Sequence, residues 1–527
     1  MKIILSLFAI IFPLITFAQE KEKNIADYFE SVIFFPINII GIDVPIVLIV
    51  LILGALFFTI YFKFPNIRLF GTAIKIVGGK YDDIDHHDAY EDVDDVNMVD
   101  GDLPDTIKIE GTQGEVTHFQ ALTAALSATV GLGNIAGVAI AIALGGPGAT
   151  FWMIVAGFIG MASKFAECTL GVKYRDVDED GTVHGGPMYY LSKGLKERGL
   201  AKLGKVFAIF FAIMAVGGSF GGGNMFQANQ AASQFTKILG LDSTMASFIF
   251  GVVVAIIVGI VIIGGIKKIG AVTEKVVPFM AVIYVLAALI ILGMNFSLID
   301  DSFGMIIDGA FNFDAGLGGF VGVLIVGFQR AAFSNEAGVG SAAIAHSAVK
   351  TKYAASEGIV ALLEPFIDTV VICTMTALVM IITNLKFGLF DYGNLTEAKD
   401  VIMNNGEVLG GVDLTSVAFD SVIPHFSIVL TVAVILFAIS TMLSWSYYGL
   451  QAWKFLFGKS QTSDLIYKGI FVLFVVIGST ISLGSVIKFS DAMIFAMVFP
   501  NVIGLIILAP RVKEELARYL SAIKASK

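Results

Sequence analysis

The stretch TVGLGNIAG, residues Thr129–Gly137, decides the fold that we expect for this chain. It lies inside the apolar span His118–Leu144 and sets Gly131 and Gly133 directly before the amide of Asn134. A glycine inside a helix costs about 1 kcal/mol relative to alanine. In a lipid bilayer, moreover, every backbone group that leaves a helix must find a partner within the protein. The sequence therefore predicts a membrane helix that is interrupted at this point, whose freed carbonyls bind a cation and the polar end of a small solute.

The overall composition is typical of a polytopic membrane protein, whose main surroundings are the lipid bilayer. Of the 527 residues, 56% are hydrophobic and 15% are charged, whereas soluble domains carry about 25% charged residues. The formal net charge of -10 in so apolar a chain argues against a nucleic-acid partner, because nucleic-acid binding needs a basic surface. The two cysteines, Cys168 and Cys373, both fall in apolar spans. We expect packed thiols and no disulfide framework.

The chain divides into a leader, eleven apolar spans and their connections. Residues 1–18, MKIILSLFAIIFPLITFA, have the charged start and apolar run of a secretory signal peptide, with a short additional membrane helix as the alternative. We predict an external segment at 19–43, an extra transmembrane helix at 44–62, a cytoplasmic acidic linker at 63–117, a ten-helix core at 118–510 and a cytoplasmic tail at 511–527. The apolar spans are Val44–Tyr61, His118–Leu144, Thr150–Val172, Val206–Ala232, Ala246–Ile266, Val276–Met294, Leu317–Ser347, Ile359–Thr383, Phe426–Ala452, Leu465–Ile487 and Ala492–Leu508.

Lysines and arginines orient these spans, because positive residues concentrate in the cytoplasmic loops of membrane proteins. Counted from an outside amino terminus, every second loop holds several of them, as in Lys173–Lys205 and Arg511–Lys527. The loops between hold isolated lysines such as Lys237 and Lys488. We therefore expect the mature amino terminus outside, the carboxyl terminus in the cytoplasm, and a multi-pass location in a bacterial-type cell (inner) membrane.

Two connections stand out by charge or length. The segment Tyr81–Asp105 is strongly acidic and contains His86 and His87. We interpret it as a solvated linker that repels itself into an extended state, with a divalent-metal site as the alternative. The segment Asn384–Pro424 is the longest external connection, and we expect it to fold over the outer mouth.

Three spans combine helix-interrupting glycines with side-chain amides. They are Thr129–Gly137 with Asn134, Gly217–Gln230 with Asn224, Gln227, Asn229 and Gln230, and Gly327–Ser341 with Gln329 and Asn335. Close helix packing explains the glycines, since small residues let membrane helices approach each other. It does not explain the amides, because a buried amide without a partner costs several kcal/mol. Polar groups inside a membrane therefore indicate a functional site.

The positions of two interruptions add a second argument. The first and third of these interrupted spans are the second and seventh apolar spans of the chain. With Val44–Tyr61 set aside as an extra helix, the other ten spans divide five and five, and an interrupted helix opens each half. An odd number of spans gives the two halves opposite orientations. Paired interrupted helices in inverted repeats indicate a transporter whose binding site lies at the membrane midplane.

Four motifs then resemble a known family. They are TVGLGNIAG, GGPMYYL at Gly185–Leu191, GGGNMFQANQ and FQRAAFSNEAGVGSAAIAHS. Together they resemble the alanine/glycine:cation symporter family, also called sodium:alanine symporters, over essentially all of Val44–Leu508. The resemblance implies an all-α LeuT-type fold, with five-plus-five inverted repeats and one extra leading helix. It also implies the import of a small neutral amino acid, chiefly alanine or glycine, coupled to Na+ and sometimes to H+.

The resemblance implies no enzyme activity and no organic cofactor. Alternatives are an H+-coupled symporter, a symporter for another amino acid such as glutamine or D-alanine, and a channel. A channel is disfavoured because the amides cluster in three spans and do not line several helices. An intramembrane enzyme is disfavoured because no H-E-x-x-H or G-x-S-x-G motif falls in a span.

An ion site between two helices is the first specific expectation. Na+ is a hard cation that prefers oxygen ligands, and the predicted ligands are Thr129, Val130, Asn134, Thr441 and Ser444. The hydroxyls of Thr441 and Ser444 lie three residues apart and so share a helix face. Taken alone, such hydroxyls are better explained by hydrogen bonds to the preceding helical turn. The resemblance, however, places this face against the first core helix.

A substrate site beside the ion is the second specific expectation. The predicted residues are Thr129, Gly131, Gly133, Asn134, Asn224, Gln227, Gln329, Ser334 and Trp445. We expect the substrate carboxylate at the amides freed at Gly131 and Gly133, where a half-helix begins with its positive dipole end. We expect the ammonium near Gln329 and Ser334, and Trp445 to limit the size of the side chain.

Other ionisable residues also lie within the spans. We interpret the acids as structural partners of a base, with proton relay as the alternative; the acids are Glu167, Glu364 and Asp368, and the bases are Arg330 and Lys164. Because its segment is interrupted, Arg330 could also pair with Glu336. His346 is interpreted as an ordinary residue at the inner end of its span.

Overall fold

The computed structural model describes residues 25–39, 41–86, 114–179, 181–241, 243–312, 316–396 and 400–526. Within these residues, eight helices are long and apolar enough to cross a membrane, or up to nine if one bent pair counts as a single span. The predicted class, an all-α polytopic membrane protein, is confirmed, whereas the count of eleven spans stays a prediction. The predicted signal peptide at 1–18 and most of the acidic segment, including His87, lie outside the described residues.

Short elements precede the first long apolar helix. Helix α2 (Ile25–Ile33) leads into an antiparallel hairpin of β1 (Pro36–Ile39) and β2 (Ile42–Pro45). Helix α3 (Ile46–Tyr61) corresponds to the predicted extra helix and contacts α10 and α27. The predicted linker then begins as the short helices α4 (Pro65–Arg68), α5 (Phe70–Val77) and α6 (Asp82–His86).

The first half of the core runs from α8 to α16. Its elements are α8 (His118–Thr129), η2 (Gly133–Gly137), α9 (Val138–Gly145), α10 (Gly148–Lys173), β3 (Asp176–Val177), β4 (Val183–His184), α11 (Pro187–Tyr189), η3 (Tyr190–Gly194), α12 (Leu195–Glu197), α13 (Ala201–Phe220), η4 (Gly221–Met225), α14 (Phe226–Ile238), α15 (Thr244–Ile262) and α16 (Gly265–Met294). Helix α10 packs against α3, α18 and α20, so it lies at the centre of the helical bundle.

The second half follows through a short connection. Its elements are η5 (Phe296–Leu298), α17 (Ile299–Ala310), α18 (Gly316–Asn335), α19 (Ala342–His346), α20 (Ala354–Val360), α21 (Leu363–Pro365), η6 (Phe366–Cys373), α22 (Thr374–Phe387), β5 (Phe390–Leu395), β6 (Val401–Met403), β7 (Val408–Leu409), α23 (Val412–Asp420), α24 (Phe426–Phe457), α25 (Gln461–Gly478), α26 (Leu483–Ala496) and α27 (Val498–Ala525). Residues 511–525, predicted as a tail, continue α27 as one helix.

The first predicted interruption is present. Helix α8 begins at a capping box, in which Thr117 Oγ1 accepts a hydrogen bond from Gln120 N and Gln120 Oε1 accepts one from Thr117 N. The helix ends at Thr129, and the chain resumes as the π-helical turn η2 and then α9. The two parts are bent by 48°. The bend therefore falls on the glycine pair that the sequence singles out.

A second interruption separates α18 from α19. Glu336, Gly338 and Gly340 have φ angles of 57°, 87° and 96° there. Glycine adopts this left-handed region without the Cβ clash that other residues meet. A Cβ added to Gly340 would also lie 2.9 Å from Asn501 Cγ on α27. The segment between α18 and α19 is therefore closely fitted to its neighbours.

The interruption predicted at Gly217–Gln230 is wrong, because the chain stays helical from Ala201 to Ile238. Helices α13 and α14 are joined by the π-helical turn η4, in which Gln227 Nε2 donates to Gly222 O at 2.9 Å. A side-chain amide thus satisfies a backbone carbonyl that the wider turn releases. A Cβ added to Gly223 would lie 2.2 Å from Trp445 Cγ, so this glycine is needed for the approach of α24.

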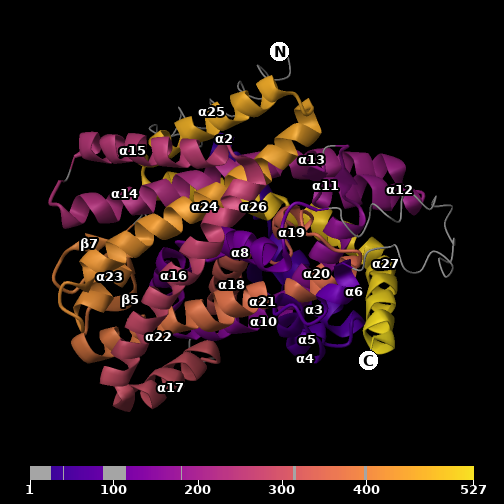
Figure 1. The fold of residues 1–527 in the computed structure, drawn as a ribbon. Coiled ribbons are helices and arrows are strands. Elements are labelled where there is room, and N and C mark those ends of the chain that lie inside the picture. Colours follow the sequence, from indigo (N-terminus) through magenta and orange to yellow (C-terminus); the bar gives the residue numbers. More distant parts are fainter. Residues whose placement is uncertain are drawn as a thin grey trace, which may run out of the picture.

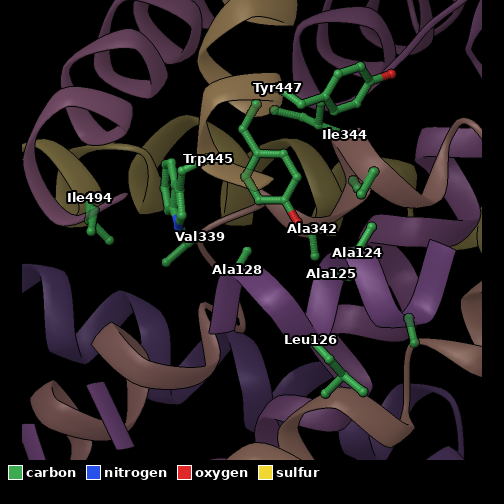
Figure 2. Close-up of a cluster of buried hydrophobic side chains, with 14 of the residues drawn as sticks. Ala124, Ala125, Leu126, Ala128, Val339, Ala342, Ile344, Trp445, Tyr447 and Ile494 are labelled. Carbon is green, nitrogen blue, oxygen red and sulfur yellow. The ribbon is translucent and has the colours of Figure 1, made fainter. Parts of the chain in front are cut away.

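Small side chains let α8 pack closely on α24. Figure 2 shows Ala124, Ala125 and Ala128 of α8 in the same cluster as Trp445 of α24. All three alanines are at most 4% exposed. Because an alanine side chain occupies little space between two backbones, membrane helices can approach each other closely along such a face. The predicted ion-site face of α24 is therefore brought against the interrupted helix.

The two ends of the molecule carry different elements. Figure 1 shows α23, β5 and β7 at one end, and α11, α12 and the end of α27 at the opposite end. The antiparallel sheet β5-β6-β7 and α23 are built from the long connection Asn384–Pro424. Thr415 Oγ1 of α23 donates to Ile135 O of η2 at 3.2 Å. This connection therefore packs directly on the interrupted helix.

Candidate functional site

Asn134 organises the first interruption. Its Oδ1 accepts a hydrogen bond from Gly131 N at 2.8 Å, so the side chain replaces a lost helical partner. Its Nδ2 donates to Asp368 Oδ1 at 2.6 Å and to Asp368 O at 3.1 Å. The same amide therefore satisfies a freed backbone group and joins η2 to η6, as a break inside a membrane requires.

Asp368 is the charged centre of this region. Its carboxylate is completely buried and accepts hydrogen bonds from Ser334 Oγ at 2.9 Å and Thr369 Oγ1 at 2.7 Å, in addition to Asn134. In the described part of the chain, no lysine, arginine or histidine forms an ion pair with it. A buried carboxylate is costly unless a cation or a proton compensates its charge.

The two interrupted helices meet at this carboxylate. A Cβ added to Gly133 would lie 3.3 Å from Ser334 Cα and 3.4 Å from its Oγ. Ser334 lies in the last turn of α18, directly before the second interruption. The expected residues Gly133, Asn134 and Ser334 therefore come together, and Asn134 and Ser334 bind Asp368. From the sequence, Asp368 is interpreted as a structural partner of a base, with proton relay as the alternative.

The predicted ion-site hydroxyls of α24 face α8. Thr441 Oγ1 donates to Ser127 O at 2.9 Å, and Ser444 Oγ donates to Ala124 O at 2.8 Å. Ser127 Oγ donates in return to Ser440 O at 2.7 Å. The two hydroxyls thus bond to the neighbouring helix and not to their own preceding turn. Oxygen atoms of both helices lie next to each other where the ion is predicted.

Thr129 and Val130 lie at the carboxyl-terminal end of α8, close to the contact between α8 and α24. Thr129 Oγ1 donates back to Ala125 O at 3.3 Å and to Leu126 O at 3.4 Å. Val130 closes the helix, and its N–H still donates to Leu126 O. A Cβ added to Gly131 would lie 2.4 Å from Thr441 Oγ1. The unwound backbone therefore passes immediately beside the predicted α24 ligand.

The amides predicted on the third core helix point in different directions. Gln227 Oε1 accepts from Leu132 N at 3.3 Å, so it reaches the first interruption. Asn224 Nδ2 instead donates to Phe471 O on α25 at 2.7 Å. The structure therefore places Gln227 at the interruption and turns the nitrogen of Asn224 toward α25.

The polar residues of α18 are divided in the same way. Gln329 Nε2 donates to Asp491 Oδ2 on α26 at 3.1 Å, and Arg330 forms an ion pair with the same carboxylate. The suggested pair of Arg330 with Glu336 does not form. Of the two residues expected near the substrate ammonium, Ser334 lies at the interruption and Gln329 lies toward α26.

Trp445 lies between the second interruption and η4. Its Nε1 donates to Glu336 Oε1 at 3.0 Å, and Ser341 Oγ donates to the other oxygen of that carboxylate. The ring is 2% exposed and packs over Gly223. Trp445 therefore fixes Glu336, whose left-handed backbone opens the second interruption.

A further set of ionisable residues lies elsewhere in the core. Lys164 Nζ lies 2.8 Å from Glu364 Oε2, which is one of the structural pairs expected from the sequence. Glu167 Oε1 accepts from Asn501 Nδ2 at 2.8 Å. His346, interpreted from the sequence as an ordinary residue, contacts both Glu357 and Glu364. His346, Glu357 and Glu364 lie within 18 residues of one another in the chain, whereas Lys164 lies 200 residues before Glu364, so no local spacing indicates the whole cluster.

Comparison with known proteins identifies the family. The model of the sodium:alanine symporter family matches residues 27–527. The sodium/alanine symporter AgcS of Methanococcus maripaludis is 41% identical over 472 residues, which cover 89% of this chain and 93% of that protein. The probable sodium/glutamine symporter GlnT of Bacillus subtilis is 32% identical and covers 79% of this chain and 81% of its own length.

Among solved structures, that of MhsT in complex with L-phenylalanine is 16% identical, with a TM-score of 0.48. It covers 78% of this chain and 99% of that one. The match to the family model extends over both interrupted helices, η6 and α24. This chain therefore belongs to the sodium:alanine symporter family, and it is a multi-pass membrane transport protein and not an enzyme.

Proposed function

We propose that this member of the sodium:alanine symporter family imports a small neutral amino acid, alanine or glycine, together with Na+ by alternating access. One observation carries the proposal. The buried carboxylate of Asp368 has no basic partner among the described residues and contacts both interrupted helices through Asn134 and Ser334. A cation bound here would compensate the charge of Asp368. Its site would be complete only when both interrupted helices contact this carboxylate.

The donor set suits Na+. A hard monovalent cation prefers oxygen ligands, and Asp368 and Ser334 supply a carboxylate and a hydroxyl. The oxygen of Asn134, which accepts from Gly131 N, would join them when the amide turns on binding. The carbonyls of Ala124 and Ser127 with the hydroxyls of Thr441 and Ser444 form a second oxygen-rich group. We assign the predicted ligands Thr129 and Val130 to this second group through their backbone carbonyls.

The amino-acid substrate would take over hydrogen bonds that side chains make here. Gly131 N donates to Asn134 Oδ1, and Leu132 N donates to Gln227 Oε1. A substrate carboxylate can accept from both N–H groups, at the positive start of the half-helix that follows. The buried ring of Trp445, held by Glu336 at the second interruption, would limit the substrate to a small side chain and so favour alanine and glycine over glutamine.

We also propose the orientation that the charges of the loops predict. The end of the molecule with β5, β7 and α23 would face outward, and the end with α12 and the last turns of α27 would face the cytoplasm. In a bacterial-type cell (inner) membrane, Na+ would then enter the protein from the outer end, which α23 covers, and would leave at the cytoplasmic end. H+ in place of Na+, and glutamine or D-alanine in place of L-alanine, are the alternatives that the experiment tests.

The test is uptake into proteoliposomes made with the purified chain. An inward Na+ gradient is expected to accumulate labelled L-alanine above the external concentration, and excess glycine is expected to compete. Equal K+ inside and outside, without Na+, is the control. Uptake that depends on a pH gradient and ignores Na+ would indicate coupling to H+. Stronger competition by glutamine or by D-alanine than by unlabelled L-alanine would identify that amino acid as the substrate. Equilibration without accumulation would indicate a channel and overturn the proposal.

A further inference from the structure

A second buried polar cluster lies apart from the site of Asp368. We call it the inner polar chain, and it consists of His118, Glu357, His346, Glu364 and Lys164. These residues come from α8, α20, α19, α21 and α10, which Figure 1 shows near one another in the middle of the molecule. His118 is 5% exposed and the other side chains are fully buried. Nothing in the proposed Na+ site uses this cluster.

The inner polar chain is continuous. Glu357 contacts His118 Nδ1 with one carboxylate oxygen and His346 Nδ1 with the other, the latter at 2.5 Å. His346 Nε2 contacts Glu364 Oε1, and Lys164 Nζ lies 2.8 Å from Glu364 Oε2. Glu357 therefore connects the first residue of α8 with α19, at the end of α8 opposite to its interruption.

His346 determines how many protons this arrangement holds. Each of its two ring nitrogens faces a carboxylate oxygen, and each of these contacts needs one hydrogen. A neutral imidazole carries a single N–H. The second hydrogen must therefore be an additional proton on His346, Glu357 or Glu364. His118 adds no such requirement, because a neutral ring can carry its N–H on Nδ1.

We propose that the inner polar chain is a proton-binding site, and that its bound proton keeps the first turn of α8 docked against α19 and α20. When this proton leaves, a ring nitrogen lone pair of His346 faces a carboxylate oxygen in a buried place. An unpaired buried polar group there is strongly unfavourable. Glu357 then no longer holds both histidines, and the start of α8 is released.

Other titratable or charged groups lie near the inner polar chain, and the experiment must distinguish their effect on the pH dependence from that of the chain itself. On α10, Cys168 Sγ lies within 4.8 Å of the ligand atoms of His346 and Glu364. Tyr448 on α24, Glu167 on α10 and Glu336 after α18 lie near enough to Glu364 or Lys164 for their charges to act on them. Arg175 donates to Ser347 O directly after α19 at 2.8 Å. These neighbouring side chains remain in place when Glu357 or Glu364 is replaced by glutamine, so a change in the pH profile is due to the replaced carboxyl group.

Two carboxyl groups near the start of α8 serve as controls. Burial raises the pKa of Glu115, whose carboxylate accepts a hydrogen bond from Val183 N at 2.9 Å. Glu274 on α16 accepts from Gln120 Nε2 of α8 at 3.0 Å. Both acids lie close to the first turn of α8, and neither contacts the ring of His346. E115Q and E274Q are therefore matched controls for acid-to-amide replacement.

The decisive variants are E357Q and E364Q. A glutamine at either position can donate an amide N–H to one ring nitrogen of His346 while the ring donates its own N–H to the remaining carboxylate. In E357Q all the hydrogen bonds of the chain are then made without an additional proton. E364Q also removes the ion-pair partner of Lys164, so this variant carries K164M as well. The bridge is kept, and its dependence on pH is removed. The two variants are independent, so failure of one to fold leaves the other.

The measurement is hydrogen–deuterium exchange of the peptide 114–126, in detergent, without Na+ or amino acid, between about pH 6 and pH 9. Exchange is corrected for the intrinsic rate at each pH. Release of one proton on opening makes the corrected rate rise by up to about tenfold per pH unit in the wild type. E357Q and E364Q are expected to show a flat profile, whereas E115Q and E274Q keep the slope.

Two outcomes would overturn the proposal. A flat corrected profile in the wild type would mean that no proton is released when α8 opens. An unchanged slope in both E357Q and E364Q would place the titrating group outside the chain. Because this readout needs neither Na+ nor transport, it is independent of the proposed function. A chain that fails the Na+ test and still shows the slope would lose the symport proposal and keep the proton site.

Discussion

Asn134 Nδ2 lies 2.6 Å from Asp368 Oδ1, while Oδ1 of the same amide accepts the N–H of Gly131. The irregular backbone of the first core helix and its contact with a buried carboxylate thus depend on one short side chain. Whatever binds Asp368 must therefore act on the geometry of the interruption. This relationship makes the proposed site testable by single substitutions on each of its sides.

Replacing Asp368 by asparagine is expected to remove the response to Na+. In D368N, the Na+ concentration for half-maximal alanine uptake should rise at least tenfold, which corresponds to about 1.4 kcal/mol. Na+ should also no longer raise the thermal unfolding temperature, because a ligand stabilises only the state that binds it. D301N, an exposed acid on α17, is the control. Wild-type Na+ dependence in D368N would exclude this carboxylate as a ligand.

The hydroxyl face of α24 is tested by T441A. Loss of the Thr441 hydroxyl removes an oxygen beside Ser127 O, so the Na+ concentration for half-maximal uptake should rise several-fold, for a loss on the order of 1 kcal/mol. Ser446 is a matched control, since its hydroxyl donates to Leu443 O in its own helix. S446A is expected to leave the Na+ dependence unchanged. Equal behaviour of T441A and S446A would contradict the assignment.

Replacement by alanine should affect two glycines of the same segment differently. A Cβ at Gly131 would lie 2.4 Å from Thr441 Oγ1, whereas a Cβ at Gly137 meets nothing within 4 Å. Overpacking of a tight core costs about 1–3 kcal/mol. We expect G131A to lower the unfolding temperature and abolish uptake, and G137A to retain both. The thermal unfolding of the two variants in the same detergent provides the measurement, and equal stabilities would disprove the close approach.

The selectivity role of Trp445 is tested by a pair of substitutions. W445A removes the ring and should let glutamine compete with alanine uptake, because a pocket gains about 1–3 kcal/mol for each methylene that it newly accommodates. W445F keeps a six-membered aromatic ring, and it removes the N–H donor to Glu336 and part of the indole volume. It should therefore keep the preference for small substrates. If glutamine does not inhibit alanine uptake by W445A, residues other than Trp445 limit the size of the substrate.

The interruption at Thr129–Gly137 could be predicted because its cause is local. Two glycines and an amide in an apolar span leave few backbone conformations, and the chain bends there by 48°. The same signal was misleading at Gly217–Gln230. There, Gln227 satisfies Gly222 O within one helical turn, so a π-helical turn absorbs the irregularity without a break.

The partners of the polar side chains could not be predicted, because they are set by tertiary packing. Asn224 and Gln329 have the same amide chemistry as Gln227, yet α25 and α26 provide Phe471 O and Asp491 as their partners. The role of Asp368 was missed for a related reason. Its partners, Asn134 and Ser334, lie 234 and 34 residues away in the sequence, so no spacing pattern connects them.

The two cysteines of the chain lie in the two polar regions described above. Cys373 Sγ lies 3.3 Å from Asn134 Nδ2 and 3.5 Å from Ser334 Oγ, whereas Cys168 lies beside His346. The protein thus carries a native chemical reporter in each region, without any engineered label. Alkylation of the intact chain, followed by mass spectrometry of the two cysteine peptides, would record separately when each region becomes open to a small reagent.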